Sequence, residues 1–173
     1  NDEHSITLAQ GGGGPAGNRL IREEILSRFG NPALSPLPDA ASLPGDLVFS
    51  TDSFVVTPRF FPGGNIGKLA VCGTVNDIAV AGGIPQYLSL AMILEEGLPR
   101  EELRQILDAA AACAETCGVT VVTGDTKVLP RGMVDGIYLN TAGIGRRNAR
   151  LSLGQDRIRP GDAVLVSGSI GEH

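Results

Sequence analysis

The 173-residue chain has no tryptophan, and aromatic residues make up only 4% of it. It therefore offers few rings on which the bases of a single-stranded nucleic acid could stack. Basic residues are also outnumbered, with 14 Lys and Arg against 19 Asp and Glu, whereas binding to a phosphate backbone depends on clustered Lys and Arg. We expect no nucleic-acid partner.

Cysteine and long apolar runs are scarce as well. Three cysteines are too few for a disulfide scaffold. No stretch reaches the ~20 apolar residues of a membrane span, and no charged and then apolar leader precedes residue 10. Because 42% of the residues are hydrophobic, the chain can still bury a core, and we expect a cytoplasmic globular protein with no membrane partner.

Glycine is the residue in excess. Its 24 copies are about twice its usual share, and many stand in short clusters at residues 11–14, 63–67 and 82–83. Main-chain N–H groups of glycine-rich turns can bind phosphate oxygens. The sequence has neither a G-x-x-x-x-G-K-[ST] loop nor a strand-coupled G-x-G-x-x-G, so a phosphate site here would be of another kind.

Hydrophobic spacing indicates an α+β pattern. Residues 1–14 form a glycine-rich arm with little intrinsic reason for order. Beyond the arm, helices are predicted at 15–29, about 66–81 and 99–117, and strands at 46–56, 87–94, 119–123, 134–145 and 162–167. Two strand–helix–strand units followed by consecutive strands predict a mixed β-sheet with helices packed on one face. Arg146 and Arg147 are expected in a solvated turn.

Three aspartates are candidates for a ligand site. Asp52 interrupts an apolar strand, Asp77 lies in a helix whose only other charged residue is Lys68, and Asp125 ends a strand before a turn. Burying a carboxylate without a partner is costly, so Asp52 and Asp77 could each pair with a cation. The simpler alternatives are surface placement for Asp52 and a structural Asp turn for Asp125.

Hydroxyls, an amide and a lysine accompany these acids. Thr74 shares a helix face with Asp77, Asn76 adjoins Asp77, and Thr126 and Lys127 follow the third aspartate. Hard oxygen ligands beside phosphate-binding groups are typical of a magnesium-nucleotide site. Lys127 could neutralise charge on transferring phosphoryl oxygens.

Lys68 and the cysteines fit such a site less well. Lys68 stands nine residues before Asp77, about 180° around a regular helix. It is therefore either a solvated lysine or a contact made from the helix start or across a subunit interface. Cys113 and Cys117 lie on an apolar helix stripe, where core packing is favoured over a redox or metal role, and Cys72 is interpreted in the same way.

Four segments resemble the hydrogenase maturation factor HypE family. They are STDSFVVTP (50–58), FFPGGNIGKLAVCGTVND (60–77), LEEGLP (94–99) and VTGDTK (122–127). The likeness runs from about residue 5 to the end. More broadly, the T-D at 52, the N-D at 77 and the G-D-T at 125 resemble the superfamily of aminoimidazole ribonucleotide synthetase, selenophosphate synthetase and thiamine-monophosphate kinase.

The resemblance implies a PurM-like N-terminal domain that dimerises through its sheet and binds ATP and Mg²⁺. It implies a flexible arm at 1–14, an ATP-binding domain at 15–168 and the start of a linker to a second domain at 169–173. By motif, Asp52, Asp77 and Asp125 match metal ligands, and Asp77 and Lys127 match catalytic residues. The implied nucleotide or phosphate contacts are Gly11, Gly12, Gly13, Gly14, Lys68, Thr74, Asn76 and Thr126.

For activity, the resemblance implies a carbamoyl dehydratase. In this family the partner HypF carbamoylates a C-terminal cysteine, ATP-dependent dehydration converts it to a thiocyanate, and a HypC–HypD complex takes the cyanide for nickel-iron hydrogenase. This chain has no such terminal cysteine, so we expect a folded, dimeric fragment that is incomplete for turnover. The alternatives are a thiamine-monophosphate kinase-like enzyme of the same superfamily and a non-catalytic dimerisation module.

Overall fold

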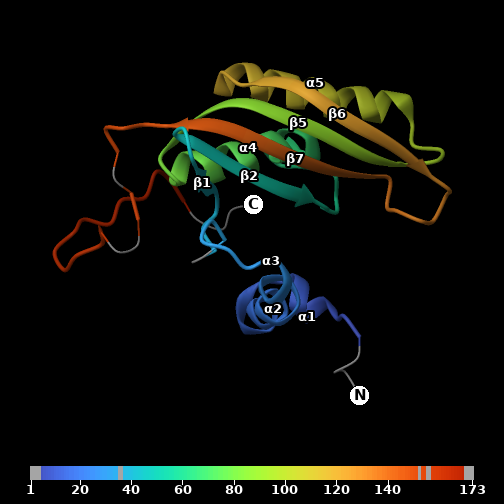
Figure 1. Ribbon diagram of the computed structural model, residues 1–173. Coiled ribbons are helices and arrows are strands. Elements are labelled where there is room, and N and C mark those ends of the chain that lie inside the picture. Colours follow the sequence, from blue (N-terminus) through green and yellow to red (C-terminus); the bar gives the residue numbers. More distant parts are fainter. Residues whose placement is uncertain (1–4, 35–36, 152, 155–156, 170–173) are drawn as a thin grey trace. The chain divides into compact units, whose positions relative to one another are not determined.

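The computed structural model describes residues 5–34, 37–151, 153–154 and 157–169. The chain divides into two units, Asn1–Pro38 and Asp39–His173 (Figure 1). None of the helices in the described ranges is long and apolar enough to cross a lipid bilayer. The second unit contains the sheet, and with it all the candidate acids and lysines.

The first unit is helical. It consists of α1 (Leu8–Gly11), α2 (Gly14–Leu20), the π-helical segment η2 (Ile21–Leu26) and α3 (Ser27–Phe29). The main-chain N–H of Thr7 donates to Gln10 Oε1 at 2.6 Å, which closes the first turn of α1. The predicted helix at 15–29 is confirmed. Within the predicted arm, residues 8–11 form the short helix α1, whose capping box joins Thr7 and Gln10, and the flexibility of the arm at 1–14 stays a prediction.

A five-stranded mixed sheet is the framework of the second unit. Its strands lie in the order β1 (Ala41–Leu43), β2 (Leu47–Phe54), β7 (Ile137–Arg147), β5 (Gly83–Glu95) and β6 (Thr120–Leu129). Neighbours pair antiparallel except β5 and β6, which are parallel. A parallel pair needs a crossover connection, and α5 (Arg100–Cys117) supplies it. Two short strands, β3 (Phe60–Phe61) and β4 (Gly64–Asn65), form a separate ribbon.

Helices α4 (Ile66–Val80) and α5 cover one face of this sheet (Figure 1). The acidic first turn of α5 suits the positive end of a helix, and Gly118 ends the helix with a left-handed φ of 66°. The core between helices and sheet contains Ile66, Ala70, Ile106, Phe54, Ile137 and Leu139. The predicted α+β fold with helices on one face is confirmed.

Three predictions near strand ends differ from the structure. β6 continues to Leu129, beyond the predicted 119–123, because it pairs with β5 over its length. Arg146 and Arg147 are the last residues of β7 and pair with Ile84 and Gly83, so they do not form a solvated turn. Residues 162–167 form no strand, since none of the described strands pairs with them.

Candidate functional site

Helix α4 holds Asp77 over the strands β2 and β7. The start of the helix is fixed by Asn65, whose side-chain oxygen accepts hydrogen bonds from the N–H groups of Gly67 and Lys68 at 2.9 and 3.2 Å. Further along, a Cβ on Gly143 of β7 would lie 2.7 Å from side-chain atoms of Thr74 and Ile78. Glycine in the strand therefore allows the helix to approach the sheet closely.

Three carboxylates, Asp39, Asp52 and Asp77, gather near the C-terminal end of α4, and we call them the acidic corner. The Ser50 hydroxyl lies 2.9 Å from the main-chain oxygen of Asp39 and 3.0 Å from Asp77 Oδ2, and it can donate its single proton to either. Asp52, two residues along β2, points to the same face as Ser50, and its Oδ2 would lie 3.5 Å from a Cβ on Gly73 of α4. The structure thus brings Asp52 and Asp77 together and adds Asp39 and Ser50, which the sequence analysis missed.

The acidic corner raises the pKa of Asp77. Partial burial is the main cause, and the negative charges of Asp52 and Asp39 act in the same direction, while the hydrogen bond from Ser50 opposes them. A bound cation would stabilise this carboxylate, and Mg²⁺ prefers such oxygen ligands. Among the described residues, no three His, Cys, Asp or Glu side chains are arranged to hold a metal ion by themselves. Phosphate or water oxygens would have to complete the coordination.

Thr74 and Asn76, both predicted nucleotide contacts, have different surroundings. Thr74 is fully buried, and its hydroxyl lies 2.6 Å from that of Thr141, which is 2.9 Å from the Ala70 carbonyl. This corrects the prediction. Thr74 is out of reach of a nucleotide, because its side chain is buried between α4 and β7 and its hydroxyl contacts that of Thr141. Asn76 is exposed beside Asp77 and remains a candidate.

Asp125, Thr126 and Lys127 lie inside the edge strand β6, not in a turn after a strand. Lys127 Nζ is 3.1 Å from Asp125 Oδ2, and both side chains are exposed. The hydrogen bond from Lys127 is the main cause that lowers the pKa of Asp125, and a bond from the Thr126 main chain adds to it. Because side chains alternate along a strand, Asp125 and Lys127 share one face and Thr126 points to the other.

Strand register separates Asp125 from the acidic corner. Asp52 belongs to a row across the sheet that also contains Thr141, Leu90 and Gly124. Asp125 belongs to the next row, with Ser53, Asn140 and Ala91. Successive rows point to opposite faces, and three spacings of about 4.8 Å separate β2 from β6. One copy of the chain therefore does not bring the three predicted metal ligands together.

Lys68 lies at the opposite end of α4 from Asp77. Its Nζ donates to the main-chain oxygen of Gly63 at 2.8 Å in an exposed setting. Nine residues of regular helix separate the two side chains by about 13 Å along the axis and half a turn around it. Lys68 therefore does not share a ligand with Asp77 within one chain, and a contact across a subunit interface stays a prediction.

The glycine cluster 11–14 belongs to the first unit. Gly13 and Gly14 have φ angles of 72° and 69°, a left-handed conformation that glycine adopts without strain. A Cβ at any of the four positions would meet no atom within 4 Å. Main-chain shape rather than crowding thus accounts for glycine at positions 13 and 14, and their contact with a nucleotide stays a prediction.

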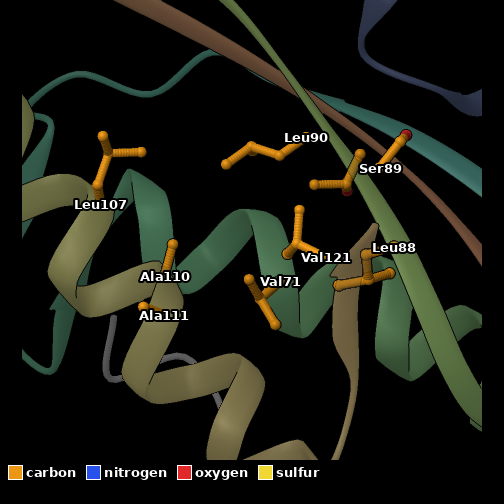
Figure 2. A pocket seen from close by; sticks show the side chains of 9 residues that line it. Val71, Leu88, Ser89, Leu90, Leu107, Ala110, Ala111 and Val121 are labelled. Atoms are coloured by element: carbon orange, nitrogen blue, oxygen red, sulfur yellow. The ribbon is translucent and has the colours of Figure 1, made fainter. Parts of the chain in front are cut away.

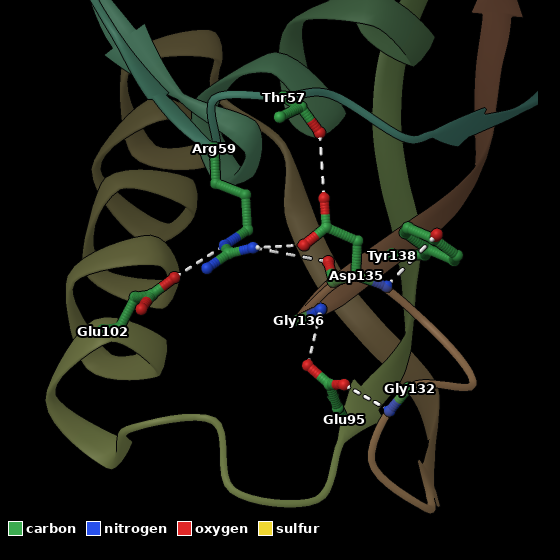
Figure 3. A network of polar contacts seen from close by, with 8 residues as sticks. All are labelled: Thr57, Arg59, Glu95, Glu102, Gly132, Asp135, Gly136 and Tyr138. Carbon is green, nitrogen blue, oxygen red and sulfur yellow. Dashed lines mark hydrogen bonds and ion pairs between the residues drawn. The ribbon is translucent and has the colours of Figure 1, made fainter.

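A polar network that the sequence analysis missed joins the β6–β7 loop to Arg59, to the start of α5 and to the end of β5 (Figure 3). Arg59 contacts Glu102 of α5 at 2.6 Å and Asp135 of the β6–β7 loop at 3.2 Å, and the hydrogen bond to Glu102 is the main cause that raises the pKa of Arg59. Glu95, at the end of β5, accepts hydrogen bonds from two glycine N–H groups of the same loop at 2.6 and 3.2 Å. Because Arg59 pairs with two carboxylates and Glu95 accepts main-chain hydrogen bonds, the network has a structural role.

An apolar hollow of about 210 Å³ lies between α4, α5 and the strands β5 and β6 (Figure 2). It is lined by Val71, Leu88, Ser89, Leu90, Leu107, Ala110, Ala111, Val121 and Thr141. None of these lining residues is charged, so the hollow is unsuited to phosphate. The acidic corner is therefore the better candidate for a nucleotide site.

Comparisons with known proteins agree with the resemblance seen in the sequence. The family model of the AIR synthase related protein, N-terminal domain, matches residues 38–147. The carbamoyl dehydratase HypE of Escherichia coli (strain K12) is 49% identical over 178 residues, which cover 98% of this chain and 53% of that protein. The chain spans about half the length of the curated relatives it matches.

Two solved structures are similar as well. One is a HypE–HypF complex, with a TM-score of 0.72 and 50% identity over 74% of this chain and 42% of that one. The other is a hydrogenase maturation protein HypE in complex with ATP, with a TM-score of 0.65 and 48% identity over 91% of this chain and 48% of that one. These matches confirm the predicted PurM-like fold and the resemblance to HypE.

Proposed function

The chain belongs to the AIR synthase related family, and from that premise we propose that it is the ATP-binding N-terminal half of a carbamoyl dehydratase of the HypE type. The acidic corner carries the proposal, because burial and two neighbouring carboxylates raise the pKa of Asp77 and so favour a bound cation. The similar protein solved with ATP supports a nucleotide as the ligand. Identity of 49% to a carbamoyl dehydratase favours this reaction over a thiamine-monophosphate kinase.

Several of the candidate residues have a proposed task. Asp52 and Asp77 would hold Mg²⁺ together with the phosphates of ATP, and the ion would neutralise charge on the phosphoryl group being transferred. Ser50 holds the Asp77 carboxylate by a hydrogen bond. Asn76 and Thr126 are proposed to contact the nucleotide, and the main-chain N–H groups of residues 11–14 are proposed to donate to its phosphate oxygens.

The proposed reaction dehydrates an S-carbamoyl cysteine to a thiocyanate, which supplies the cyanide ligands of nickel-iron hydrogenase. A carbamoyl oxygen is a poor leaving group. Transfer of the γ-phosphoryl group onto that oxygen makes phosphate the leaving group, and loss of the nitrogen protons then leaves S–C≡N. Lys127 is proposed to neutralise the charge that develops on the transferring oxygens. The substrate cysteine would belong to the part of the relatives that this chain does not span.

A second copy of the chain is proposed to complete the site. Asp125 and Lys127 are on the face of the sheet that α4 and α5 leave open, and the same face exposes the apolar row Phe49, Ile144 and Tyr87. An exposed apolar row supports association through this face. In a homodimer, the Asp125–Lys127 pair of one copy would then serve the acidic corner of the other.

Two protein partners and a compartment follow from the proposed reaction. The solved HypE–HypF complex supports HypF as the carbamoyl donor, and a HypC–HypD complex is proposed as the cyanide acceptor. The need for ATP supports a cytoplasmic setting. Gel filtration of the chain with purified HypF tests the first contact, and separate elution at micromolar concentration would remove HypF from the proposal.

Calorimetry with Mg²⁺ and a non-hydrolysable ATP analogue tests the proposed binding. We expect binding by the chain, its loss in Asp77→Asn and its retention in Asp108→Asn, a matched control because Asp108 is an exposed aspartate on α5. Binding only by a version extended to the relatives' length would restrict the proposal to the longer protein. Binding by neither would overturn it and favour the non-catalytic dimerisation module.

A further inference from the structure

The three cysteines meet between α4 and α5, and the proposed ATP site uses none of them. Cys72 Sγ of α4 lies 3.3 Å from Cys113 Sγ of α5. Cys117 follows Cys113 by one helical turn. Cys113 is buried, whereas Cys72 and Cys117 are partly exposed. Two thiols from different helices are thus in direct contact, and a small reagent can reach one of them.

The two helices are close enough to be joined covalently. A Cβ on Gly67 of α4 would lie only 2.1 Å from the main-chain oxygen of Ile106 of α5, and the contact continues along both helices past the small buried residues Ala110 and Ala114. A disulfide requires Cα atoms within about 7 Å and a sulfur separation of about 2.05 Å. Closing the gap of 3.3 Å between the sulfurs therefore needs only a small movement of the side chains.

We propose that Cys72 and Cys113 are a modification site, a dithiol that a peroxide oxidises to a disulfide. In the first step the partly exposed Cys72 sulfur attacks hydrogen peroxide, which gives Cys72 sulfenic acid and one water. In the second step Cys113 Sγ attacks the Cys72 sulfur. The S–S bond forms, the S–O bond breaks, and the departing hydroxide takes the Cys113 proton and leaves as a second water. The two sulfurs together lose two electrons, and the peroxide gains them.

The geometry selects Cys72 rather than Cys117 as the partner of Cys113. Residues four apart on a helix have Cβ atoms about 5–6 Å apart, beyond the ~3.5–4.5 Å that a disulfide allows, so a Cys113–Cys117 bond would distort α5. Burial and the neighbouring thiols raise the pKa of Cys113 to about 12, which keeps it protonated. Cys72 is accordingly the sulfur that reacts first.

The cross-link would tie α4, which carries Asp77, to α5. It closes a loop of about 40 residues between Cys72 and Cys113, and the resulting loss of chain entropy in the unfolded state stabilises the folded form. In a chain of this size, we expect the oxidised form to unfold at a temperature roughly 5–10 °C higher than the reduced form. Reduction with dithiothreitol should reverse the shift.

Peptide mapping by mass spectrometry tests the proposal. Cleavage after Lys68, Arg100, Arg104 and Lys127 places Cys72 in fragment 69–100 and both other cysteines in fragment 105–127. After peroxide treatment we expect these two fragments to be linked, with a mass loss of about 2 Da, in the wild type and in Cys117→Ser. The link should be absent in Cys72→Ser and in Cys113→Ser.

The unfolded chain provides the control. In urea, the shorter loop favours a Cys113–Cys117 bond over one that spans about 40 residues, so the linked fragments should appear only after oxidation of the folded chain. Two results would overturn the proposal. One is separate alkylated fragments under conditions that fully oxidise a free small thiol, and the other is a Cys113–Cys117 bond in the folded wild type.

Discussion

Asp77 shows how one residue can destabilise the ligand-free chain and still suit the proposed function. It lies in the last turn of α4, where burial, Asp52 and Asp39 all disfavour its charged form. A carboxyl group whose pKa is higher in the folded than in the unfolded chain stabilises the fold while it is protonated. This contribution is lost as the pH rises through the folded-state pKa, because the folded chain then releases the extra proton that it holds. The same crowding of negative charge makes the acidic corner favourable for a cation.

Asp77→Asn should therefore have opposite effects on stability and on binding. Without ligand, the variant should unfold at a higher temperature than the wild type at pH 7, and the difference should shrink as the pH falls through the raised pKa of Asp77, because protonation then removes the charge from the wild type. Binding of Mg²⁺ and an ATP analogue should weaken by at least about 10-fold. Thermal unfolding across this pH range and calorimetry measure the two effects. An equal or lower unfolding temperature at pH 7 would contradict the electrostatic account.

At the scale of elements, the position of α4 depends on glycines in the strand beneath it. Thr74 and Ile78 face Gly143, and the hydroxyl contact between Thr74 and Thr141 closes the remaining space. At Gly143 the helix therefore rests on the main chain of the strand rather than on a side chain. Because Asp77 follows Thr74 by three residues, a change in the distance between α4 and the sheet would move the Asp77 carboxylate relative to Asp52.

Gly143→Ala tests this packing. The added Cβ would lie 2.7 Å from Thr74 and Ile78, and overpacking of this kind lowers the free energy of unfolding by about 1–3 kcal/mol. Gly168→Ala is the control, because a Cβ at Gly168 meets nothing within 4 Å. Urea unfolding of both variants gives the comparison. Equal stability of the two would show that α4 can move away from the sheet without loss.

The loop network makes a second element-scale prediction. Arg59 and Glu102 have side chains only 25% and 20% exposed, so Arg59→Ala would leave a shielded carboxylate unpaired and should cost about 2–3 kcal/mol of stability. The control is Arg104→Ala, which breaks the open pair with Glu101, whose side chains are 65% and 69% exposed, and should change stability by no more than about 0.5 kcal/mol. Urea denaturation at constant salt measures both, and similar losses in the two variants would refute the role of shielding.

At the scale of the whole molecule, our proposal divides the site between two copies of the chain. The acidic corner faces α4, whereas Asp125 and Lys127 are on the open face three strands away. The site would also be divided along the sequence. The match to one relative covers 98% of this chain but only 53% of that protein, and the part that this chain does not span would supply the substrate cysteine. Activity would then require two copies and both halves.

Mixing two inactive variants tests the shared site. In the longer protein, Asp77→Asn and Lys127→Ala should each abolish most ATP turnover. If each site takes Asp77 from one copy and Lys127 from the other, random mixing makes half of the dimers heterodimers, each with one intact site. Turnover should then recover to about one quarter of the wild-type rate. No recovery after verified subunit exchange would place both residues in the same copy's site.

Agreement between sequence and structure is best where the information is local. The bounds of α4 and α5 follow from Asn65 as N-cap, the left-handed Gly118 and the apolar spacing between them. Strand ends were harder to predict. β6 extends to Leu129 only because β5 lies beside it, while the apolar run at 162–167 has no partner among the described strands.

Local sequence patterns were enough to predict an α+β domain with carboxylates in apolar surroundings and with glycine at sharp turns, because spacing, capping and turn chemistry act between neighbours in the chain. Tertiary structure alone decided which of those carboxylates meet. Packing of α4 on the sheet sets Asp77 beside Asp52, and strand register turns Asp125 to the other face. Helix packing likewise brings Cys72 to Cys113. Such contacts depend on distances between residues far apart in the chain, which no local pattern specifies.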